Sequence, residues 1–340
     1  MSGKDERIKL GHGSGGKMTH ELIDKLFVKH FSNPVLDRQT DAALLEIPTG
    51  RLAFTTDAFV VDPIFFPGGD IGKLAVCGTV NDVAVSGATP LYLSAAFIIE
   101  EGFPMEELER IVISMAKEAE KAGVTIVTGD TKVVGKGHCD KVFITTTGVG
   151  ALEEKHLHIS EGKRIQAGDK IIINGSIGDH GMAIMSARNE LKLSAPLQSD
   201  CASLNGLITE ITGATQQVRF MRDATRGGLA TVITELSTAK DYGVNIDEEA
   251  LLIDEGVRGM CELLGFDPMY VANEGKVVIV VAADDADKAL KAMQKHEFGK
   301  NARIIGEVVP EHPGKAWLKT AIGGNQIIDM LAGEQLPRIC

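Results

Sequence analysis

The sequence of 340 residues lacks the signatures of several large protein classes. It has no uncharged apolar run near the ~18–20 residues that a membrane-spanning helix needs. Residues 1–10 are too charged for the apolar core of a signal peptide. Neither a Walker A pattern nor a GxGxxG motif after a strand is present, which argues against standard P-loop and Rossmann sites. We therefore expect a soluble, cytoplasmic protein with no membrane partner.

Positive charge and paired cysteines are also scarce. The chain has 35 Lys and Arg against 47 Asp and Glu, a net charge of −12. Nucleic-acid binding requires a basic face, so we expect no nucleic-acid partner. No two of the five cysteines form a CxxC pair, which excludes a zinc ribbon. Four of them have mostly apolar neighbours, as buried thiols do, whereas Cys340 is the last residue and cannot be held from both sides.

Glycine is the abundant residue, with 38 in the chain. This is about 11%, against a typical share of about 7%. Many glycines stand beside Asp, Asn or Thr, where they allow tight turns or a close approach of the backbone to a ligand. Both interpretations stay open at this stage.

The hydrophobic pattern predicts two α+β domains, residues 1–155 and 156–330, and a mobile tail, 331–340. Each domain shows a strand, a helix with an acidic start and a second strand. Pro337 prevents a helix from continuing into the tail. We expect helices over residues 18–31, 72–86, 104–122, 181–189, 201–212 and 229–241, with another capped by Asp284. Strands are expected over 51–56, 91–99, 124–128, 141–149, 170–174, 276–283 and 303–309.

Four aspartates recur where strands or small-residue turns end: Asp41, Asp57, Asp82 and Asp130. Carboxylate oxygens are ligands that Mg²⁺ prefers. If these segments converge, the four acids form an oxygen cage for magnesium. Each one alone is more typical of a cap or a turn.

Other charged residues offer candidate chemistry. Lys132 could neutralise a transferring phosphate, or be a solvated lysine. Glu274 precedes an apolar strand and could act as a general base if burial raises its pKa, or be a surface carboxylate in a turn. Residues 222–228 contain two glycines that open a helix N-terminus, a natural anion site. His12 and His180 lie in glycine loops, where they contact phosphate or are bystanders.

Long motifs carry a family resemblance. Residues 62–84, 127–132 and 222–228 are similar to the ATP-binding core of the aminoimidazole ribonucleotide synthetase (PurM-like) superfamily. The ending 337–340, Pro-Arg-Ile-Cys, narrows the resemblance to its HypE-like hydrogenase maturation branch. The glycine loop near residue 13 and residues 174–181 agree, so the resemblance covers essentially the whole chain.

The resemblance implies a two-domain PurM-like α+β fold. It implies a homodimer whose N-terminal domains join in a β-barrel-like interface, where ATP and Mg²⁺ bind under a glycine-rich lid, residues 1–17. The implied magnesium ligands are Asp57, Asp82 and Asp130, with Asp41 as a further candidate. The implied ATP contacts are Gly13, Ser14, Gly15, Gly16, Lys73, Asn81, Thr131 and Lys132.

The resemblance also implies an activity. Such proteins receive a carbamoyl group on the terminal cysteine from the carbamoyltransferase HypF and dehydrate it with ATP to an S-cyano group. The cyanide then passes to iron on a HypC–HypD scaffold during nickel–iron hydrogenase assembly. By this resemblance Cys340 is the carrier. The chemistry of the reaction makes Glu274 the candidate base and Lys132 the candidate for stabilising the transferred phosphoryl group or the amide oxygen. His12 and His180 are the next candidates for the base.

Two alternatives remain. One is a superfamily enzyme acting on a free small molecule, such as a selenophosphate synthetase or an amide-activating purine enzyme. Selenophosphate synthetases carry Cys or selenocysteine in the N-terminal glycine loop, and residues 11–17 contain neither. A free-substrate enzyme also has no evident use for Cys340. The other alternative is a catalytically silent nucleotide-binding scaffold whose tail docks a partner.

Overall fold

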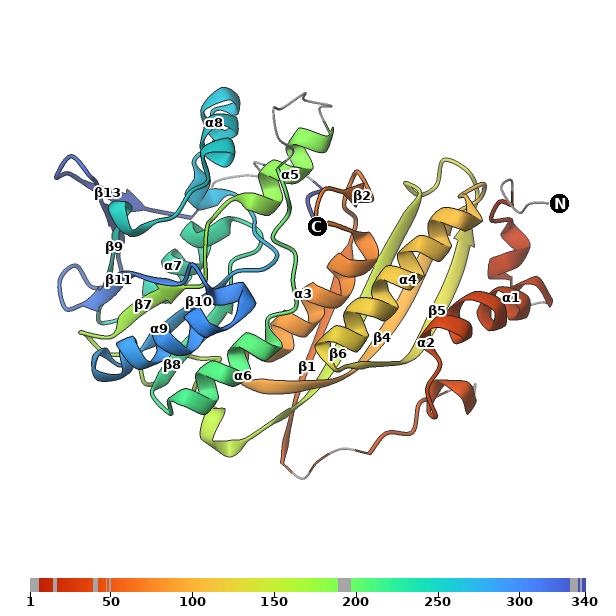
Figure 1. Ribbon diagram of the computed structural model, residues 1–340, viewed down its shortest axis with the longest axis horizontal. Coiled ribbons are helices and arrows are strands. Elements are labelled where there is room, and N and C mark those ends of the chain that lie inside the picture. Colours follow the sequence, from red (N-terminus) through yellow and green to blue (C-terminus); the bar gives the residue numbers. More distant parts are fainter. Residues whose placement is uncertain are drawn as a thin grey trace.

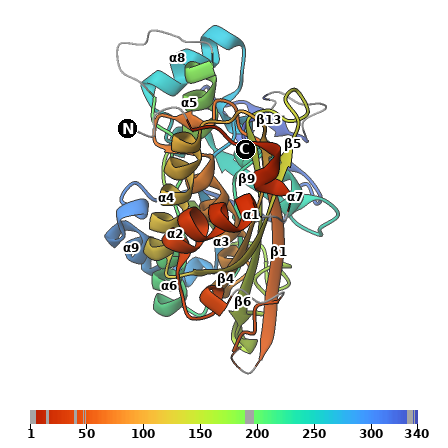
Figure 2. The ribbon, with the colours of Figure 1, turned by 90° about the vertical axis from the view of Figure 1, so that its right-hand side faces the viewer.

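Two sheets covered by helices make up the structure, a computed structural model (Figure 1). It describes residues 6–14, 17–38, 42–46, 48, 50–188, 197–330, 336 and 338–340. The final residue lies at the junction of the two halves in Figure 1, and Figure 2 shows the molecule from the side of the first half. The C-terminal segment is therefore placed where the domains meet.

The first half is built on a four-stranded sheet of order β1-β6-β4-β5, in which only the β4–β5 pair is parallel. Helices α3 and α4 cover one face of this sheet. The elements are η1 (Leu10–Gly13), α1 (Lys17–Leu22), the π-helical η2 (Ile23–Val28), α2 (Lys29–Phe31), η3 (Leu36–Arg38), β1 (Arg51–Phe59), β2 (Phe65–Phe66), β3 (Gly69–Asp70), α3 (Ile71–Val85), β4 (Ala88–Glu100), α4 (Met105–Ala122), β5 (Thr125–Val134), β6 (Val142–Leu152) and η4 (Glu154–His156).

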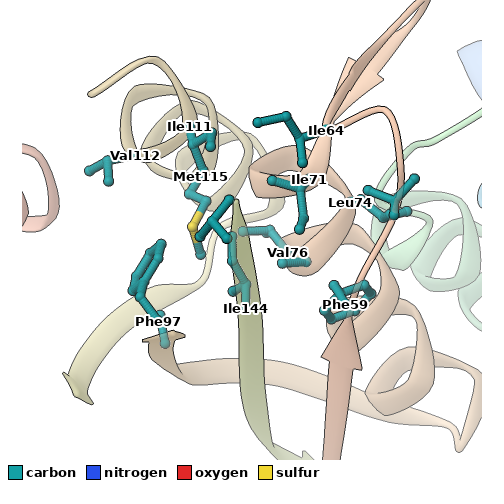
Figure 3. Close-up of a cluster of buried hydrophobic side chains, with 14 of the residues drawn as sticks. Phe59, Ile64, Ile71, Leu74, Val76, Phe97, Ile111, Val112, Met115 and Ile144 are labelled. Atoms are coloured by element: carbon teal, nitrogen blue, oxygen red, sulfur yellow. The ribbon is translucent and has the colours of Figure 1, made fainter. Parts of the chain in front are cut away.

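Glycines bring α3 close to the sheet. A Cβ on Gly150 of β6 would lie 2.4 Å from a methyl of Val83, and one on Gly78 of α3 would lie 2.9 Å from the ring of Phe59. The resulting core joins side chains of α3, α4 and the strands (Figure 3). Because α3 is buried along almost its whole length, its polar residues must find partners inside the protein.

The opposite face of this sheet is open. Residues of β1 alternate in exposure, and the outward Leu52 and Phe54 are 49% and 73% exposed. Ile98 of β4 is 41% exposed. Within the described residues the four strands form no closed barrel, so the expected β-barrel-like interface is not present in one chain.

The second half is built on a seven-stranded sheet of order β13-β12-β9-β11-β7-β10-β8. Alternating residues of β7 and β10 pack against α7 on one face and against α6 and α9 on the other. The elements are β7 (Lys170–Ile173), α5 (Asp179–Arg188), α6 (Asn205–Ala214), β8 (Val218–Asp223), α7 (Gly228–Ser237), β9 (Gly243–Asp247), η5 (Glu248–Ala250), α8 (Glu255–Leu264), η6 (Pro268–Tyr270), β10 (Val277–Val281), η7 (Ala283–Asp285), α9 (Ala286–Lys295), η8 (Glu297–Gly299), β11 (Arg303–Val309), β12 (Ala316–Lys319) and β13 (Asn325–Ile328). Among the described residues, no helix combines the length and apolarity needed to cross a bilayer.

The buried amide of Asn81 joins the two halves. From α3 it donates to the carbonyls of Ala202, at 3.0 Å, and Glu274, at 3.4 Å, and it accepts from the backbone N–H of Leu204, at 2.7 Å. These contacts fill the hydrogen-bonding capacity of the side chain except for one lone pair. They fix two segments of the second domain against α3.

Most expected elements are confirmed, with several corrections. Asp57 and Asp130 lie inside β1 and β5 and do not follow the ends of these strands, whereas Asp82 lies in α3, within the predicted helix. The helix expected from residue 201 begins at Asn205, because backbone groups of residues 202–204 bond outside the helix. Asp284 does not cap α9; it lies in η7. Helix α8 was not predicted, and neither were six strands, β2, β3, β8, β9, β12 and β13.

The expected mobility of the tail stays a prediction. Residues 338–340 are held by backbone and side-chain hydrogen bonds at the domain junction. Residues 331–335 and 337 lie outside the described residues.

We predict that Asn81→Ala destabilises the protein. The variant leaves the N–H of Leu204 without its acceptor in a buried junction, and an unsatisfied buried polar group costs about 1–3 kcal/mol. Thermal and urea unfolding measure the loss. Asn325→Ala, at an exposed position in β13, is the matched control. Equal stability of the two variants would contradict a structural role for Asn81.

Candidate active site

A cavity of about 370 Å³ opens between the two domains. Its walls include Asp82 of α3, Asp223 at the end of β8, and Thr225 and Arg226 from the segment between β8 and α7. The pocket therefore joins an acid of the first domain to an acid and a guanidinium of the second.

Strand pairing brings two loops of the second domain together here. Asp223, the last residue of β8, pairs with Val277, the first of β10, so the end of one strand meets the start of the other. The N–H of Ala224 donates to the carbonyl of Lys276 at 3.0 Å. The backbone N–H and the side-chain amide of Asn273 both donate to the carbonyl of Ala224, at 3.1 and 2.8 Å. Glu274 and Arg226 thus sit on loops that are bonded to each other.

Glycine is required where the first of these loops turns into α7. Gly228 has a φ of 60°, and a Cβ there would lie 2.5 Å from the carbonyl oxygen of Met269. The turn places Arg226 just before the helix N-terminus, where free N–H groups attract anions. The expected anion-binding character of residues 222–228 stays a prediction.

Two predicted magnesium ligands, Asp57 and Asp82, lie together beside Asp223. Thr79 donates to Asp57 at 2.7 Å, and Thr55 donates to Asp82 at 3.0 Å. Burial raises the pKa of Asp82 to about 7, and the charges of Asp223 and Asp57 act in the same direction. Burial also raises the pKa of Asp223 to about 6. This is a cluster of acids in which holding every negative charge at once is unfavourable.

Glu274 is buried, with 3% exposure, so the surface-turn alternative is wrong. Its burial raises the pKa of the carboxyl well above the usual value, and the charges of Asp223 and Asp200 add to the effect. Arg226 opposes the shift. A carboxylate with a raised pKa is a stronger base than an ordinary glutamate once it is ionised.

The thiol of Cys340 lies within this group of charges. Burial raises its pKa to about 12, with the charge of Glu274 acting in the same direction and Arg226 opposing both. The half-buried side chain packs against the core of the first domain. The structure therefore brings the predicted carrier and the predicted base to one place.

A second group of predicted residues gathers along β5. A Cβ on Gly13 would lie 2.3 Å from the backbone nitrogen of Val133, so the glycine loop rests directly on this strand. Ser14 bonds to the carbonyl of Gly11 at 3.1 Å. Lys132 pairs with Asp130 at 3.0 Å, and both side chains are more than 60% exposed. Thr131, between them, is buried.

The two groups lie at opposite edges of the first sheet. One row of paired residues runs from Asp57 through Thr146 and Ala95 to Gly129. Three strand spacings of about 4.8 Å separate its ends by about 14–15 Å. One chain thus does not bring Asp130 or Lys132 to the Asp57–Asp82 pair, and among the described residues no group of three or more acids, His or Cys is arranged to hold a metal.

The remaining candidates are dispersed. Lys73 donates to the carbonyl of Gly68 at 3.0 Å, on the first turn of α3. Asn81 bonds the second domain, which favours a structural role over ATP binding. His12 accepts from the N–H of Lys9 at 2.9 Å. Gly15, Gly16 and Asp41 lie outside the described residues.

Sequence reasoning missed the individual roles of Asp223 and Arg226 and the contacts of Arg188. The first two belong to the motif at residues 222–228, which was recognised as a helix start but not resolved into residues. Arg188 donates to the carbonyls of Asp62 and Arg338, at 2.7 and 2.8 Å. No local pattern marks Arg188, since its partners are distant in sequence.

Comparisons with known proteins agree with this architecture. The family models for the N-terminal and C-terminal domains of AIR synthase related protein match residues 39–152 and 166–319. Carbamoyl dehydratase HypE of Rhodobacter capsulatus is 51% identical over 343 residues, which cover 100% of both chains.

Solved structures give the same result. A crystal structure of hydrogenase maturation protein HypE in complex with ATP has a TM-score of 0.93 at 47% identity, covering 98% of this chain and 99% of that chain. A chain of a HypE–HypF complex has a TM-score of 0.79 at 51% identity, covering 91% and 99%. With identity at this level over its whole length, the chain belongs to the HypE family of carbamoyl dehydratases.

Proposed function

We propose that this chain dehydrates a carboxamide carried on its own Cys340, using ATP, to an S-cyano group that supplies the cyanide ligand of iron in nickel–iron hydrogenase maturation. The observation that carries the proposal is the packing of Cys340 against the core of the first domain, where the charges of Glu274 and Arg226 act on its thiol. The membership of the HypE family supports the same reaction.

The reaction needs two events at the carried group. The carboxamide oxygen attacks the γ-phosphorus of ATP and ADP leaves, because an unactivated amide oxygen is a poor leaving group. The nitrogen then loses its protons while the carbon–oxygen bond breaks and phosphate departs, which leaves a nitrile on sulfur. The carried group loses one oxygen and two hydrogens, and the phosphate keeps the oxygen.

Glu274 is the proposed base for the nitrogen protons. It is buried beside the thiol that would carry the amide, and its raised pKa suits proton abstraction. His180 is a weaker candidate, since its two nitrogens already contact Ser199 and the carbonyl of Ile339. His12 lies in η1, which packs on β5, and its Nδ1 contacts Lys9.

Asp57 and Asp82 are the proposed magnesium pair. Mg²⁺ uses one or two carboxylates and completes its shell with water and phosphate oxygens, so a pair suffices. The raised pKa of Asp82 supports this, because a bound cation relieves the repulsion with Asp57 and Asp223. When bound, the ion would offset charge on the ATP phosphates.

ATP is proposed to contact the group along β5. Gly13, Ser14, Thr131 and Lys132 offer backbone and cationic donors there, and Asp130 lies among them. An apolar cavity of about 140 Å³ adjoins them, with Phe27 and Phe97 in its wall. Such a cavity suits a flat heterocycle such as adenine. Lys132 remains the proposed residue for the phosphoryl group.

A homodimer is proposed to unite the two groups. Within one chain they lie about 14–15 Å apart across the sheet. The open face between them exposes Leu52, Phe54 and Ile98, which is unfavourable in water and typical of an interface. A second copy on that face would bury these side chains and could bring its β5 edge to the acid pair.

The proposed partners follow from the chemistry. Cys340 must receive its carbamoyl group from a donor, for which HypF is proposed because a similar chain forms a HypE–HypF complex. The cyano group must then reach iron, and a HypC–HypD scaffold is proposed as the acceptor.

Cys340→Ala is predicted to accept no carbamoyl group while folding and binding ATP normally. The measurement is intact mass after incubation with HypF, carbamoyl phosphate and ATP. Cys139→Ala, at the other partly exposed thiol, is the control and should be modified like the wild type. Carbamoylation and cyanation of Cys340→Ala would refute the carrier assignment.

Glu274→Gln is predicted to be carbamoylated normally but to form the nitrile at least roughly a hundredfold more slowly, since general-base catalysis contributes ~10²–10⁴-fold. Single-turnover mass spectrometry of the tail peptide follows the loss of water. Glu262→Gln, on the exposed side of α8, serves as the control. Near-normal dehydration by Glu274→Gln would move the base role elsewhere.

Asp82→Asn is predicted to stabilise the nucleotide-free protein in EDTA at pH 8 but not at pH 4. The folded state keeps the proton of Asp82 up to about pH 7, whereas the unfolded chain loses it near pH 4. The wild type therefore loses stability as pH rises through this window. We expect a gain on the order of 1–3 kcal/mol in urea unfolding. Exposed Asp241→Asn is the control, and an equal gain at both pH values would argue against the buried cluster.

A further inference from the structure

A buried carboxylate to which the proposed reaction assigns no role binds the turn that carries Glu274. Oδ1 of Asp200 accepts the backbone N–H of Glu274 at 3.1 Å, and Oδ2 accepts that of Gly275 at 3.0 Å. The Asp200 side chain is 5% exposed. Its two oxygens thus bind successive N–H groups, one of which belongs to the proposed base.

Glycine at position 275 permits this contact. A Cβ there would lie 1.9 Å from the carbonyl oxygen of Asp200, so a larger residue would push the two segments apart. The N–H of Ala202 also donates to the carbonyl of Glu274, at 3.4 Å. Residues 200–202 therefore lie directly against the turn and bind it through both side chain and backbone.

The ammonium of Lys276 compensates the buried charge of Asp200. Its Nζ lies 2.8 Å from Oδ2 of Asp200 and 3.5 Å from Oδ2 of Asp179, and the lysine side chain is 9% exposed. Burial acts to raise the pKa of Asp200, but the charge and hydrogen bond of Lys276 outweigh it and lower that pKa. Asp200 is therefore ionised at neutral pH, and N–H bonds to a carboxylate are stronger than those to a neutral acceptor.

The buried amide of Asn174 fixes the residues that follow. Its Nδ2 donates to the carbonyl of Gly275 at 3.0 Å, and its Oδ1 accepts the N–H of Val277 at 2.8 Å. These bonds hold the start of β10, whereas the bond from Asp200 holds the N–H of Glu274 itself. The direction in which the Glu274 side chain leaves the backbone thus depends on Asp200.

We propose that Asp200 is a positioning residue for the base, because its carboxylate fixes the backbone of Glu274 and so the place of the Glu274 carboxyl beside the carried amide. The inference rests on the proposed function. Proton abstraction requires the base within hydrogen-bond reach of the proton, and a displacement of about 1 Å can cost about a hundredfold in rate. A carboxyl on a turn reaches this precision only when the turn is held.

The experiment compares Asp200→Asn with wild type and with a matched control, Asp169→Asn. Asparagine keeps the shape of the side chain but has one acceptor oxygen in place of two, so at least one of the two N–H bonds is lost. The Asp169 side chain is also buried, at 2% exposure, accepts the N–H of Gln166 at 2.9 Å and lies 3.7 Å from Arg219. It stands at the opposite end of β7 and β10 from the Glu274 turn.

A second variant keeps the test decisive if Asp200→Asn does not fold. That variant removes the nearer of the two carboxylates that pair with buried Lys276. Combining Asp200→Asn with Lys276→Gln removes both charges of the pair, so no uncompensated ammonium stays buried. The double variant is expected to show the same changes at the turn.

The first measurement is hydrogen–deuterium exchange of the backbone N–H groups of Glu274 and Gly275, without ATP or HypF. A hydrogen bond to a charged group contributes about 1.5–3 kcal/mol, so we expect exchange at least roughly tenfold faster in Asp200→Asn. The N–H groups of β10 are the internal reference, and Asp169→Asn should leave the turn as in the wild type. Unchanged exchange at both N–H groups would overturn the inference.

The second measurement is the rate at which the carbamoyl adduct on Cys340 becomes the cyano adduct, with and without Glu274→Gln. We expect Asp200→Asn alone to slow this conversion roughly ten- to a hundredfold, with transfer from HypF and ATP affinity kept within about twofold. If Asp200 acts through Glu274, it has little further effect once Glu274→Gln is present.

Conversion is followed at several pH values and the plateau rates are compared. Burial raises the pKa of Glu274, and the charges of Asp223, Asp200 and Asp82 add to this while Arg226 opposes it. Loss of the Asp200 charge therefore displaces the pH profile to lower pH, and the plateau separates this effect from misplacement of the carboxyl.

Two outcomes of the second measurement would contradict the inference. One is a plateau rate for Asp200→Asn within about twofold of wild type. The other is an equal slowing with Glu and with Gln at position 274, because purely structural damage lowers the rate in both backgrounds. A wild type that never converts its carbamoyl group would refute the proposed function, while the exchange rates still decide whether Asp200 holds the turn.

Discussion

The hydrogen bonds of Asn81 are the interaction on which the site depends. They hold the backbone of residues 202–204 and of Glu274 against the middle of α3. The next residue of α3 is Asp82, which faces the acid cluster. This turn of α3 therefore sets the distance between Asp82 of the first domain and Glu274 of the second. Because α3 is itself packed on β6 through glycines, this relation is rigid.

The junction concentrates acids that a purely structural core would avoid. Asp82, Asp223 and Glu274 all have pKa values raised by burial, and each is raised further by other acids. The charge of Arg226 acts to lower the pKa values of Glu274 and Cys340, yet Arg226 has no ion-pair partner among the described residues. Perturbed acids around a cavity, with a cation nearby, are typical of sites that bind charged ligands and move protons.

The sequence predicted the elements with strong periodicity, such as α4 and β10, because burial follows their repeat directly. It also marked Glu274 and Cys340, which the structure brings together. It could not separate Asp130 from Asp57, since the strand order that puts them on opposite edges is a long-range property. Nor could it find the contact of Asn81 with Ala202 or that of His180 with Ile339, because these partners lie more than 100 residues away in the sequence. Local patterns constrain local structure, whereas side-chain partners depend on packing.

The environment of Cys340 also affects the two proposed reactions differently, the transfer of a carbamoyl group to its thiol and the dehydration of the group that it then carries. A thiolate, not a thiol, attacks a carbamoyl donor, and the raised pKa of about 12 keeps the Cys340 thiol protonated at the domain junction. Away from Glu274, Asp57 and Asp223 the thiol would return toward its ordinary pKa and become a better nucleophile. Once carbamoylated, the sulfur has no proton to lose. The burial and the negative charges that oppose ionisation of the thiol therefore no longer affect it. The acids that keep the free thiol protonated are then the same groups to which the proposed dehydration assigns proton transfer and cation binding.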